Sequence, residues 1–216
     1  MNHMTDQTTD QPTNKQAVQD NAKRLVLASQ SGVRRDLLAG AGLKFEACVS
    51  GVDEAAIKQS GDRDGPALAL ALSVAKAQAV SADRTGSYII GADQVLACDG
   101  QLFDKPADMQ AARQNLTFLR GKTHSLLSGV ALVRDGEILW QHCAEARLTM
   151  RDFSDDFLDI YLAQSGAEIL SSVGCYRLEA LGSQLFEHIE GDYFTILGLP
   201  LVALLGALRH HGVVLS

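Results

Sequence analysis

Two serines and two arginines near the first apolar segment have the chemistry to bind an anion. Ser29 and Ser31 follow the apolar residues 25–28, and Arg34 and Arg35 come soon after them. If a strand gives way to a helix here, hydroxyls, backbone N–H groups, the helix dipole and guanidinium groups meet at one point, which suits phosphate. In the alternative interpretation, a serine only caps the helix and the arginines are solvated. Two arginines in a first helical turn oppose the dipole, and a bound anion would remove that conflict.

A carboxylate is the second candidate. Asp93 follows the largely apolar residues 87–92, which read as a buried strand. The C-terminal end of such a strand is a common place for a metal ligand or a general base in enzymes built on sheets. The alternative is an ordinary turn aspartate that caps the next segment.

Three lysines and a histidine are further candidates. Lys76 is the single charged residue in the run 68–80, so it either snorkels to solvent or reaches a ligand. Lys105 stands in a turn that the following proline stiffens, and Lys122 comes two residues before His124. A histidine in such a place is more often hydrogen-bonded structure than catalyst. None of these signals is specific on its own.

The elements that would position these groups follow no regular alternation. An Asp-Gly pair at 135–136 is a strong hairpin signal between two long strand-like runs, and residues 165–198 read as mostly loop. The pattern predicts an α+β fold with an elongated mixed sheet flanked by helices. Predicted strands cover 25–28, 44–49, 87–92 with a continuation at 95–97, 123–133 and 137–150, and predicted helices cover 34–41, 66–82, 108–119, 155–164 and 199–211.

The chain divides into a tail and one domain. Residues 1–22 are rich in Thr, Gln, Asn and Asp and have almost no large apolar side chains, so they cannot offset the entropy of ordering. We predict a disordered tail over 1–22 and a single domain over 23–216.

Charge and hydropathy limit the partners. The 216 residues include 19 Lys plus Arg and 26 Asp plus Glu, a formal net charge of -7. A nucleic-acid polymer is therefore not an expected partner, because its binding needs a net basic face. No apolar run reaches the ~18 residues of a membrane span, and the start has no apolar signal region, so we expect a cytoplasmic protein without a membrane partner.

The four cysteines point to no scaffold role. Cys48, Cys98, Cys143 and Cys175 stand far apart, with no Cys-x-x-Cys pair and no histidine at metal-ligand spacing. We expect reduced thiols that are mostly buried, rather than disulfides or a zinc site.

In their order along the chain, these features resemble the Maf family of nucleotide pyrophosphatases, and the resemblance spans residues 24–212. Each block is short, but they stand together in register. The resemblance implies hydrolysis of a nucleoside triphosphate between the α and β phosphates, on an α+β fold, and it implies a homodimer. The matching blocks are 28–38, 52–54, 75–77, 91–93, 105–106, 121–124, 190–193 and 198–201.

The resemblance also implies roles for single residues. Asp93 is the expected catalytic residue, and Glu54 joins it in holding a divalent cation, Mg²⁺ or Mn²⁺, which takes carboxylate or phosphate oxygens. A triphosphate with about four negative charges needs several Lys and Arg side chains. The residues predicted to bind it are Ser29, Ser31, Arg34, Arg35, Lys76, Lys105 and Lys122.

Three positions bear on which nucleobase the substrate carries. Members similar to the dTTP/UTP enzymes usually have Thr after the catalytic Asp and a Gln in a late Tyr-x-Ile-Gln segment, where this chain has Gln94 and Glu179. A carboxylate suits guanine, whose edge donates hydrogen bonds, so the substitution favours the 7-methyl-GTP branch. Val33 departs from that branch, which often has a Trp there to stack on the cationic purine. Asp104 also departs from the pattern, because a Gly commonly precedes the Lys-Pro pair.

Other functions stay open at this point. The same family contains the dTTP/UTP pyrophosphatases, and the Maf name is associated with septum formation, which a non-catalytic regulator would serve. A phosphatase that removes only the terminal phosphate would release orthophosphate instead of pyrophosphate.

Overall fold

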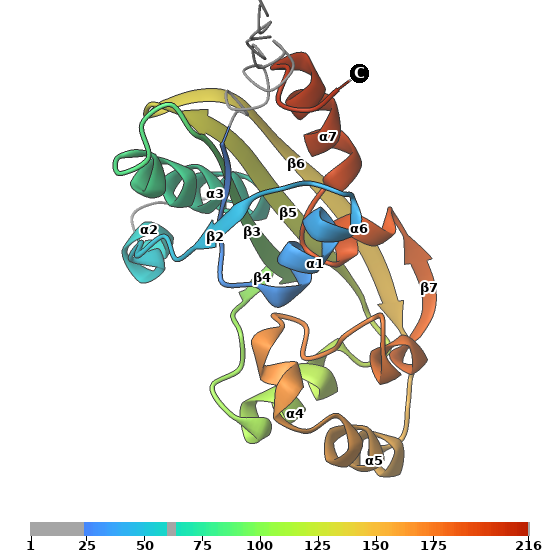
Figure 1. Cartoon of the computed structure of the whole chain (residues 1–216). Helices are drawn as coiled ribbons and strands as arrows, with labels where there is room; N and C mark the ends of the chain where they lie inside the picture. Colours follow the sequence, from blue (N-terminus) through green and yellow to red (C-terminus); the bar gives the residue numbers. More distant parts are fainter. Residues whose placement is uncertain (1–23, 60–63, 216) are drawn as a thin grey trace, which may run out of the picture.

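The computed structural model of the chain describes residues 24–59 and 64–215 (Figure 1). The tail predicted at 1–22 lies outside these residues. Within them, no helix combines the length and the apolar character that crossing a bilayer requires.

A mixed seven-stranded sheet runs through the molecule (Figure 1). Its order is β2-β1-β3-β5-β6-β7, with β4 paired to β3 beside this path. β1 is parallel to both of its neighbours, and all other pairs are antiparallel. The strands are β1 Leu25–Ala28, β2 Glu46–Cys48, β3 Tyr88–Cys98, β4 Gln101–Phe103, β5 Thr123–Arg134, β6 Glu137–Met150 and β7 Phe186–Glu190.

Helices cover both faces of this sheet, as the α+β prediction requires. One face packs on α3, and the opposite face packs on α1 and α7. The predicted fold class, an elongated mixed sheet flanked by helices, is confirmed. The α-helices are α1 Gly32–Gly40, α2 Glu54–Gln59, α3 Gly65–Ser81, α4 Met109–Leu119, α5 Asp155–Ser165, α6 Tyr193–Ile196 and α7 Leu201–His210, and two 3-10 helices are η1 Gly166–Ser171 and η2 Leu181–Leu185.

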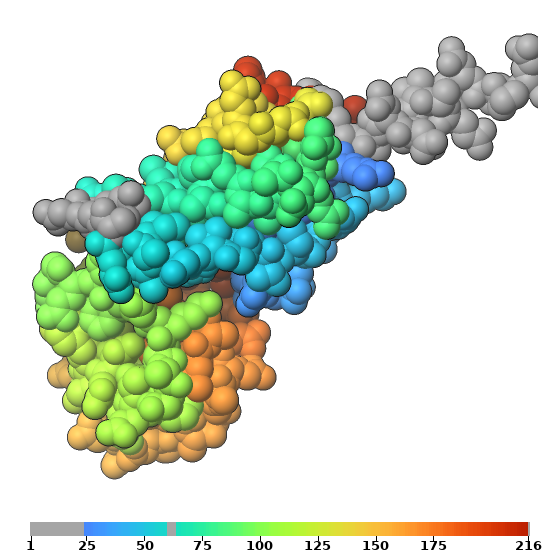
Figure 2. Space-filling view, turned by 90° about the vertical axis from the view of Figure 1, so that its left-hand side faces the viewer, coloured from blue at the N-terminus to red at the C-terminus, as the bar shows by residue number. Residues whose placement is uncertain are grey.

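A second group of elements packs at one end of the long strands. There α4, α5 and η1 share an apolar core with the ends of β3, β5 and β6 (Figure 1). Figure 2 shows a hollow between the blue and cyan segments and this green and orange part. The hollow is the place where the site described below lies.

The contact of α3 with the sheet depends on two glycines. A Cβ added to Gly91 on β3 would lie 2.0 Å from the carbonyl oxygen of Ser73, and one added to Gly129 on β5 would lie 2.4 Å from the carbonyl oxygen of Ala69. Both neighbours are backbone atoms of α3, so neither can move aside cheaply. The two glycines therefore let the helix backbone touch the sheet.

The third strand differs from its prediction. Asp93 does not follow a strand end, because β3 continues to Cys98 and pairs with β5 as far as Ala97. The strand that ends is β1, whose last residue, Ala28, pairs with Gly91. Asp93 thus lies just beyond the end of its parallel neighbour.

Residues 165–198 contain more structure than the predicted loop. They form η1, η2, β7 and α6, and β7 pairs with β6 from Arg147↔Glu190 to Met150↔Phe186. The strand has mostly exposed side chains, so its pairing partner rather than an apolar pattern defines it.

The cysteines are free, as predicted. Cys98 and Cys175 are buried, whereas Cys48 and Cys143 are only half-buried, so the expectation that most are buried holds for two of the four.

We predict that Gly91→Ala lowers the free energy of unfolding, because the new methyl group meets the α3 backbone. The loss should reach the upper end of the ~1–3 kcal/mol that overpacking a core costs. Gly206→Ala is the matched control, since nothing lies within 4 Å of its added Cβ and the residue is in an exposed helical position. Chemical denaturation measures both, and equal stability of Gly91→Ala and the parent chain would contradict the close approach.

Candidate active site

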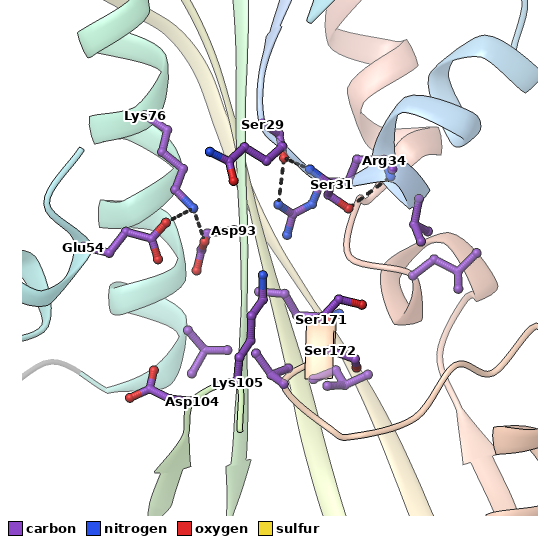
Figure 3. Close-up of a pocket in the computed structure, with 18 of the residues that line it drawn as sticks. Ser29, Ser31, Arg34, Glu54, Lys76, Asp93, Asp104, Lys105, Ser171 and Ser172 are labelled. Carbon is purple, nitrogen blue, oxygen red and sulfur yellow. Dashed lines mark hydrogen bonds and ion pairs between the residues drawn. The ribbon is translucent and has the colours of Figure 1, made fainter. Parts of the chain in front are cut away.

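A cavity of about 1260 Å³ opens between the β1–α1 turn, α2, α3, the strands β3 and β4, and residues 167–179. Figure 3 shows its central part, with polar side chains from several elements pointing inward. Every predicted site residue except Arg35 and Lys122 lines it. Those that do are Ser29, Ser31, Val33, Arg34, Glu54, Lys76, Asp93, Gln94, Lys105 and Glu179.

The ammonium group of Lys76 joins two carboxylates in this cleft (Figure 3). Its Nζ lies 2.5 Å from Oδ1 of Asp93 and 2.8 Å from Oε1 of Glu54. The side chains of Lys76 and Asp93 are only 10% and 13% exposed, so the lysine does not snorkel to solvent. A buried ammonium must be paired, and these carboxylates pair it.

Asp93 is accessible from the cleft because its neighbours leave room. On one side β1 has ended, and on the other the residue directly opposite is Gly129, whose missing side chain lets α3, the helix of Lys76, approach the sheet. Asp93 therefore has its backbone in the sheet and its carboxylate in the cavity.

Glu54 stays a carboxylate at the start of α2. Partial burial raises the pKa of Glu54, but the hydrogen bond from Lys76 and the charges of Lys76, Lys58 and Lys105 outweigh that effect and leave it below its ordinary value. The cleft thus holds an ionised Glu54 among cations.

The guanidinium group of Arg34 makes hydrogen bonds within the protein and keeps one nitrogen for a ligand. Its Nε donates to the carbonyl oxygen of Gly198 at 2.8 Å, and its Nη1 donates to the carbonyl oxygen of Ala92 at 2.9 Å and to Oγ of Ser29 at 3.3 Å. Among the described residues no partner remains for Nη2, which is free to bind an anion. Burial lowers the pKa of Arg34, against the opposing charges of Asp93 and Glu54.

The two serines shape the turn that precedes α1. Oγ of Ser31 caps the helix by accepting the N–H of Arg34 at 3.4 Å, and Oγ of Ser29 accepts the N–H of Ser31 at 3.2 Å. Of the alternative interpretation, the capping part holds for Ser31, whereas Arg34 is bonded to the protein and not solvated. The hydroxyl protons of both serines can still be donated to a ligand.

Two lysines complete the cationic part of the cleft. Lys105 extends into it toward Asp93 and Ser29 (Figure 3), and burial and then the nearby Arg34 lower its pKa. Lys58 is a lining residue that the sequence analysis missed. It pairs with Asp104, and this pair raises its pKa above the ordinary value despite partial burial. Its spacing of four residues from Glu54 on one helix was the available signal.

The three predicted specificity residues also line the cleft. Oε1 of Glu179 accepts a hydrogen bond from Nε of Arg177 at 3.0 Å. The amide nitrogen of Gln94 is taken up by the protein. Its Nε2 donates to Oγ of Ser128 and to the carbonyl oxygens of Thr195 and Ile196, at 2.9 to 3.1 Å, which leaves its amide oxygen for a base. Val33 is half-buried and offers only an aliphatic surface.

Arg35 and Lys122 are corrections to the prediction. Consecutive helical residues point in different directions, so Arg35 is exposed on α1 while Arg34 faces the cleft. Lys122 bonds Oδ2 of Asp99 at 2.8 Å, with its ammonium 3.6 Å from the centre of the Phe118 ring. Neither lines the cavity.

The described residues contain no group of three or more His, Cys, Asp or Glu side chains that could hold a metal ion. The carboxylates of Glu54 and Asp93 lie within reach of one another, since both contact the same ammonium. Mg²⁺ is commonly held by one or two carboxylates together with substrate phosphates, so this pair fits such an ion when a phosphate supplies further oxygens.

Fold and cleft define a class: a mixed α/β protein that surrounds two carboxylates with cations suited to a small polyanion. The chain belongs to the Maf family, since the family described as "Maf-like protein" matches residues 24–211. Its relatives include a "Nucleoside triphosphate pyrophosphatase" of Paramagnetospirillum magneticum, 53% identical with 87% of this chain and 98% of that protein covered. A protein of the same description from Nitrobacter hamburgensis is 50% identical, with 91% and 98% covered. A "7-methyl-GTP pyrophosphatase" of Rhizobium meliloti is 47% identical, with 88% and 97% covered.

We predict that, as the pH rises, binding of inorganic pyrophosphate weakens at a lower pH than it would if every lysine of the site had an ordinary pKa. Because the pKa of Lys105 is lowered, its ammonium loses its proton at a lower pH than that of an exposed lysine. The loss of this positive charge lowers the affinity for the anion. Lys105→Gln should weaken binding at neutral pH about tenfold. Lys105→Arg should move the alkaline loss to higher pH.

Calorimetric titration of pyrophosphate across pH checks these expectations. Lys122→Gln is the matched control, because Lys122 lies outside the cleft and should leave the affinity unchanged. Equal effects of the two Gln variants would overturn the assignment of Lys105 to the anion site.

Proposed function

We propose that this protein is a nucleoside triphosphate pyrophosphatase, which hydrolyses the bond between the α and β phosphates and releases a nucleoside monophosphate and pyrophosphate. The observation that carries the proposal is the Lys76 ammonium that joins Asp93 and Glu54 inside a cleft with further cations. Membership of the Maf family and the descriptions of its relatives support the same reaction.

The cations divide the work of holding the substrate. Lys76, Lys105 and the free Nη2 of Arg34 face the phosphates, while the hydroxyls of Ser29 and Ser31 donate hydrogen bonds to phosphate oxygens. In a cleft partly closed to water, these fixed charges stabilise the charge that develops on the departing pyrophosphate.

Asp93 is the proposed general base. Its carboxylate takes a proton from the attacking water as the oxygen of that water bonds to phosphorus and the bridging P–O bond breaks. Lys76 holds the carboxylate in position through the 2.5 Å contact, and Glu54 holds Lys76 from the other side.

A divalent cation is part of this proposal. Glu54 and Asp93 would hold Mg²⁺ or Mn²⁺ together with phosphate oxygens, and the ion would polarise a phosphoryl oxygen and lower the pKa of the attacking water. A cytoplasmic location and a homodimer also belong to the proposal, and the homodimer rests on the resemblance to the family alone.

For the base, we propose 7-methyl-GTP as the preferred substrate. The carboxylate of Glu179 lines the same cavity as Lys76 and can accept hydrogen bonds from the edge of guanine. Several relatives at 46% to 47% identity have the description "7-methyl-GTP pyrophosphatase", which supports this branch over that of dTTP and UTP.

Asp93→Asn tests the reaction. The variant should fold and still bind nucleotide, but pyrophosphate release should fall about 10²- to 10⁴-fold because the general base is gone. Asp83→Asn, an exposed change outside the cleft, is the matched control. The assay resolves pyrophosphate from orthophosphate, with and without Mg²⁺ or Mn²⁺.

The outcomes separate the alternatives. Full turnover by Asp93→Asn would refute its role, and orthophosphate as the product would identify a phosphatase. If a septum phenotype survives in cells that carry Asp93→Asn, a non-catalytic regulatory role accounts for it.

Glu179→Gln tests the base. We expect kcat/KM for 7-methyl-GTP to fall about 10- to 100-fold, since hydrogen bonds to a charged acceptor are lost, and the preference to move toward pyrimidines. Glu187→Gln, on an exposed part of β7, serves as the control. An unchanged nucleotide profile would show that Glu179 does not read the base.

A further inference from the structure

The segment that carries Glu179 contains a strained residue. Cys175 adopts the left-handed backbone region, with φ of 58°, although it is not glycine or asparagine, and its side chain is fully buried. Such a conformation persists only where the surroundings hold it, and residues of this kind often occur at functional sites.

Two helices hold this turn in place. The hydroxyl of Tyr161 on α5 donates to the carbonyl oxygen of Cys175 at 3.0 Å, and Nδ2 of Asn115 on α4 contacts its Sγ at 3.8 Å. Both contacts come from the group of elements at the end of the sheet, so they fix the turn to that group.

A third contact joins the turn to the sheet itself. The hydroxyl of Tyr176 lies 2.7 Å from Nε2 of His124, on β5, and both side chains are almost completely buried. Their rings pack with Phe186, whose centre is 4.8 Å from that of Tyr176 and 6.0 Å from that of His124. β5 also pairs with β3 at Asp93, the proposed general base, so one strand supports both Asp93 and this turn.

His124 has no other polar partner for its ring. Its Nδ1 makes no hydrogen bond to any described residue, and burial lowers the pKa of the imidazole to about 4, so the ring is neutral. The single hydrogen bond to Tyr176 is therefore the specific polar interaction that the buried histidine makes, and the ring itself does not line the cleft.

The turn leads directly into the cleft. Tyr176, Arg177, Leu178 and Glu179 all line the cavity. Arg177 bonds Glu179 and also pairs with Glu168 of η1, so Glu168 contacts the guanidinium group that holds the Glu179 carboxylate. A displacement of Tyr176 would therefore move the group that faces the base.

We propose that His124 is a positioning residue for nucleobase recognition, which acts through its hydrogen bond to Tyr176 to fix the strained turn that presents Glu179 to the cleft. The inference rests on the proposed function and concerns only the base end of the site. The residues proposed to bind the phosphates lie mainly on β1, α1, α2, α3 and β3, and of the elements that support them only β5, which pairs with β3, also carries His124.

Two single changes and one conservative change test this role. Tyr176→Phe keeps the ring and removes the hydroxyl, and His124→Leu removes the ring nitrogens. Each should raise KM for 7-methyl-GTP about tenfold, within the range expected for one lost hydrogen bond in a buried network, with little change in kcat. His124→Gln, whose amide can reach the position of Nε2, should restore most of the affinity.

Inorganic pyrophosphate separates positioning of the base from a general loss of structure. Because it has no base, its affinity should be the same in the parent chain and in Tyr176→Phe. Tyr193→Phe, an exposed tyrosine outside the cleft, is the matched control and should change neither quantity.

Each result either supports or overturns the positioning role of His124. An unchanged KM and nucleotide profile in Tyr176→Phe would overturn the proposal, as would a parallel loss of pyrophosphate affinity, which indicates a merely structural role. Pyrophosphate release by the parent chain tests the proposed function separately. If the parent chain released none while Tyr176→Phe weakened nucleotide binding alone, the function would fail and the positioning role would stand.

Discussion

The buried ammonium of Lys76 is the interaction on which the rest of the site depends. A charge at this depth is tolerated because Asp93 and Glu54 both contact it, and removal of either partner would leave a buried charge poorly paired. The pairing requires that α3 lie against the sheet with no side chain between them, which Gly91 and Gly129 allow. The packing of α3, the glycines of β3 and β5, and Glu54 at the start of α2 are thus all needed to pair the Lys76 ammonium.

This constraint explains how a chain with a net charge of -7 can bind a polyanion. The cations of the cleft already have protein partners: Lys76 has two carboxylates, Lys58 has Asp104, and Arg34 has three oxygen atoms. The repulsion among them is therefore moderated before a ligand arrives. A triphosphate would bring negative charge to a place where burial lowers the pKa values of Arg34 and Lys105, and where the charge of Arg34 lowers that of Lys105 further.

The two ends of the cleft have different supports. The phosphate end is built from β1, α1, α2 and α3, whereas Glu179 belongs to a segment tied to α4, α5 and β5 through Cys175 and Tyr176. Because most of these supports differ and β5 is shared, the residues proposed to read the nucleobase can change with little effect on the carboxylate of Asp93.

The sequence by itself determined the local features, namely the helix predicted at 66–82 and observed as α3 over Gly65–Ser81, the hairpin at Asp135, and the blocks that contain most of the site. Only the tertiary structure decided that Lys58 enters the cleft while Lys122 leaves it for Asp99, and that β3 continues past Asp93. Caps, turns and periodicity depend on neighbours in sequence, which a pattern records. The direction of a long side chain and the length of a paired strand depend on partners that are distant in sequence, and folding alone brings those partners together.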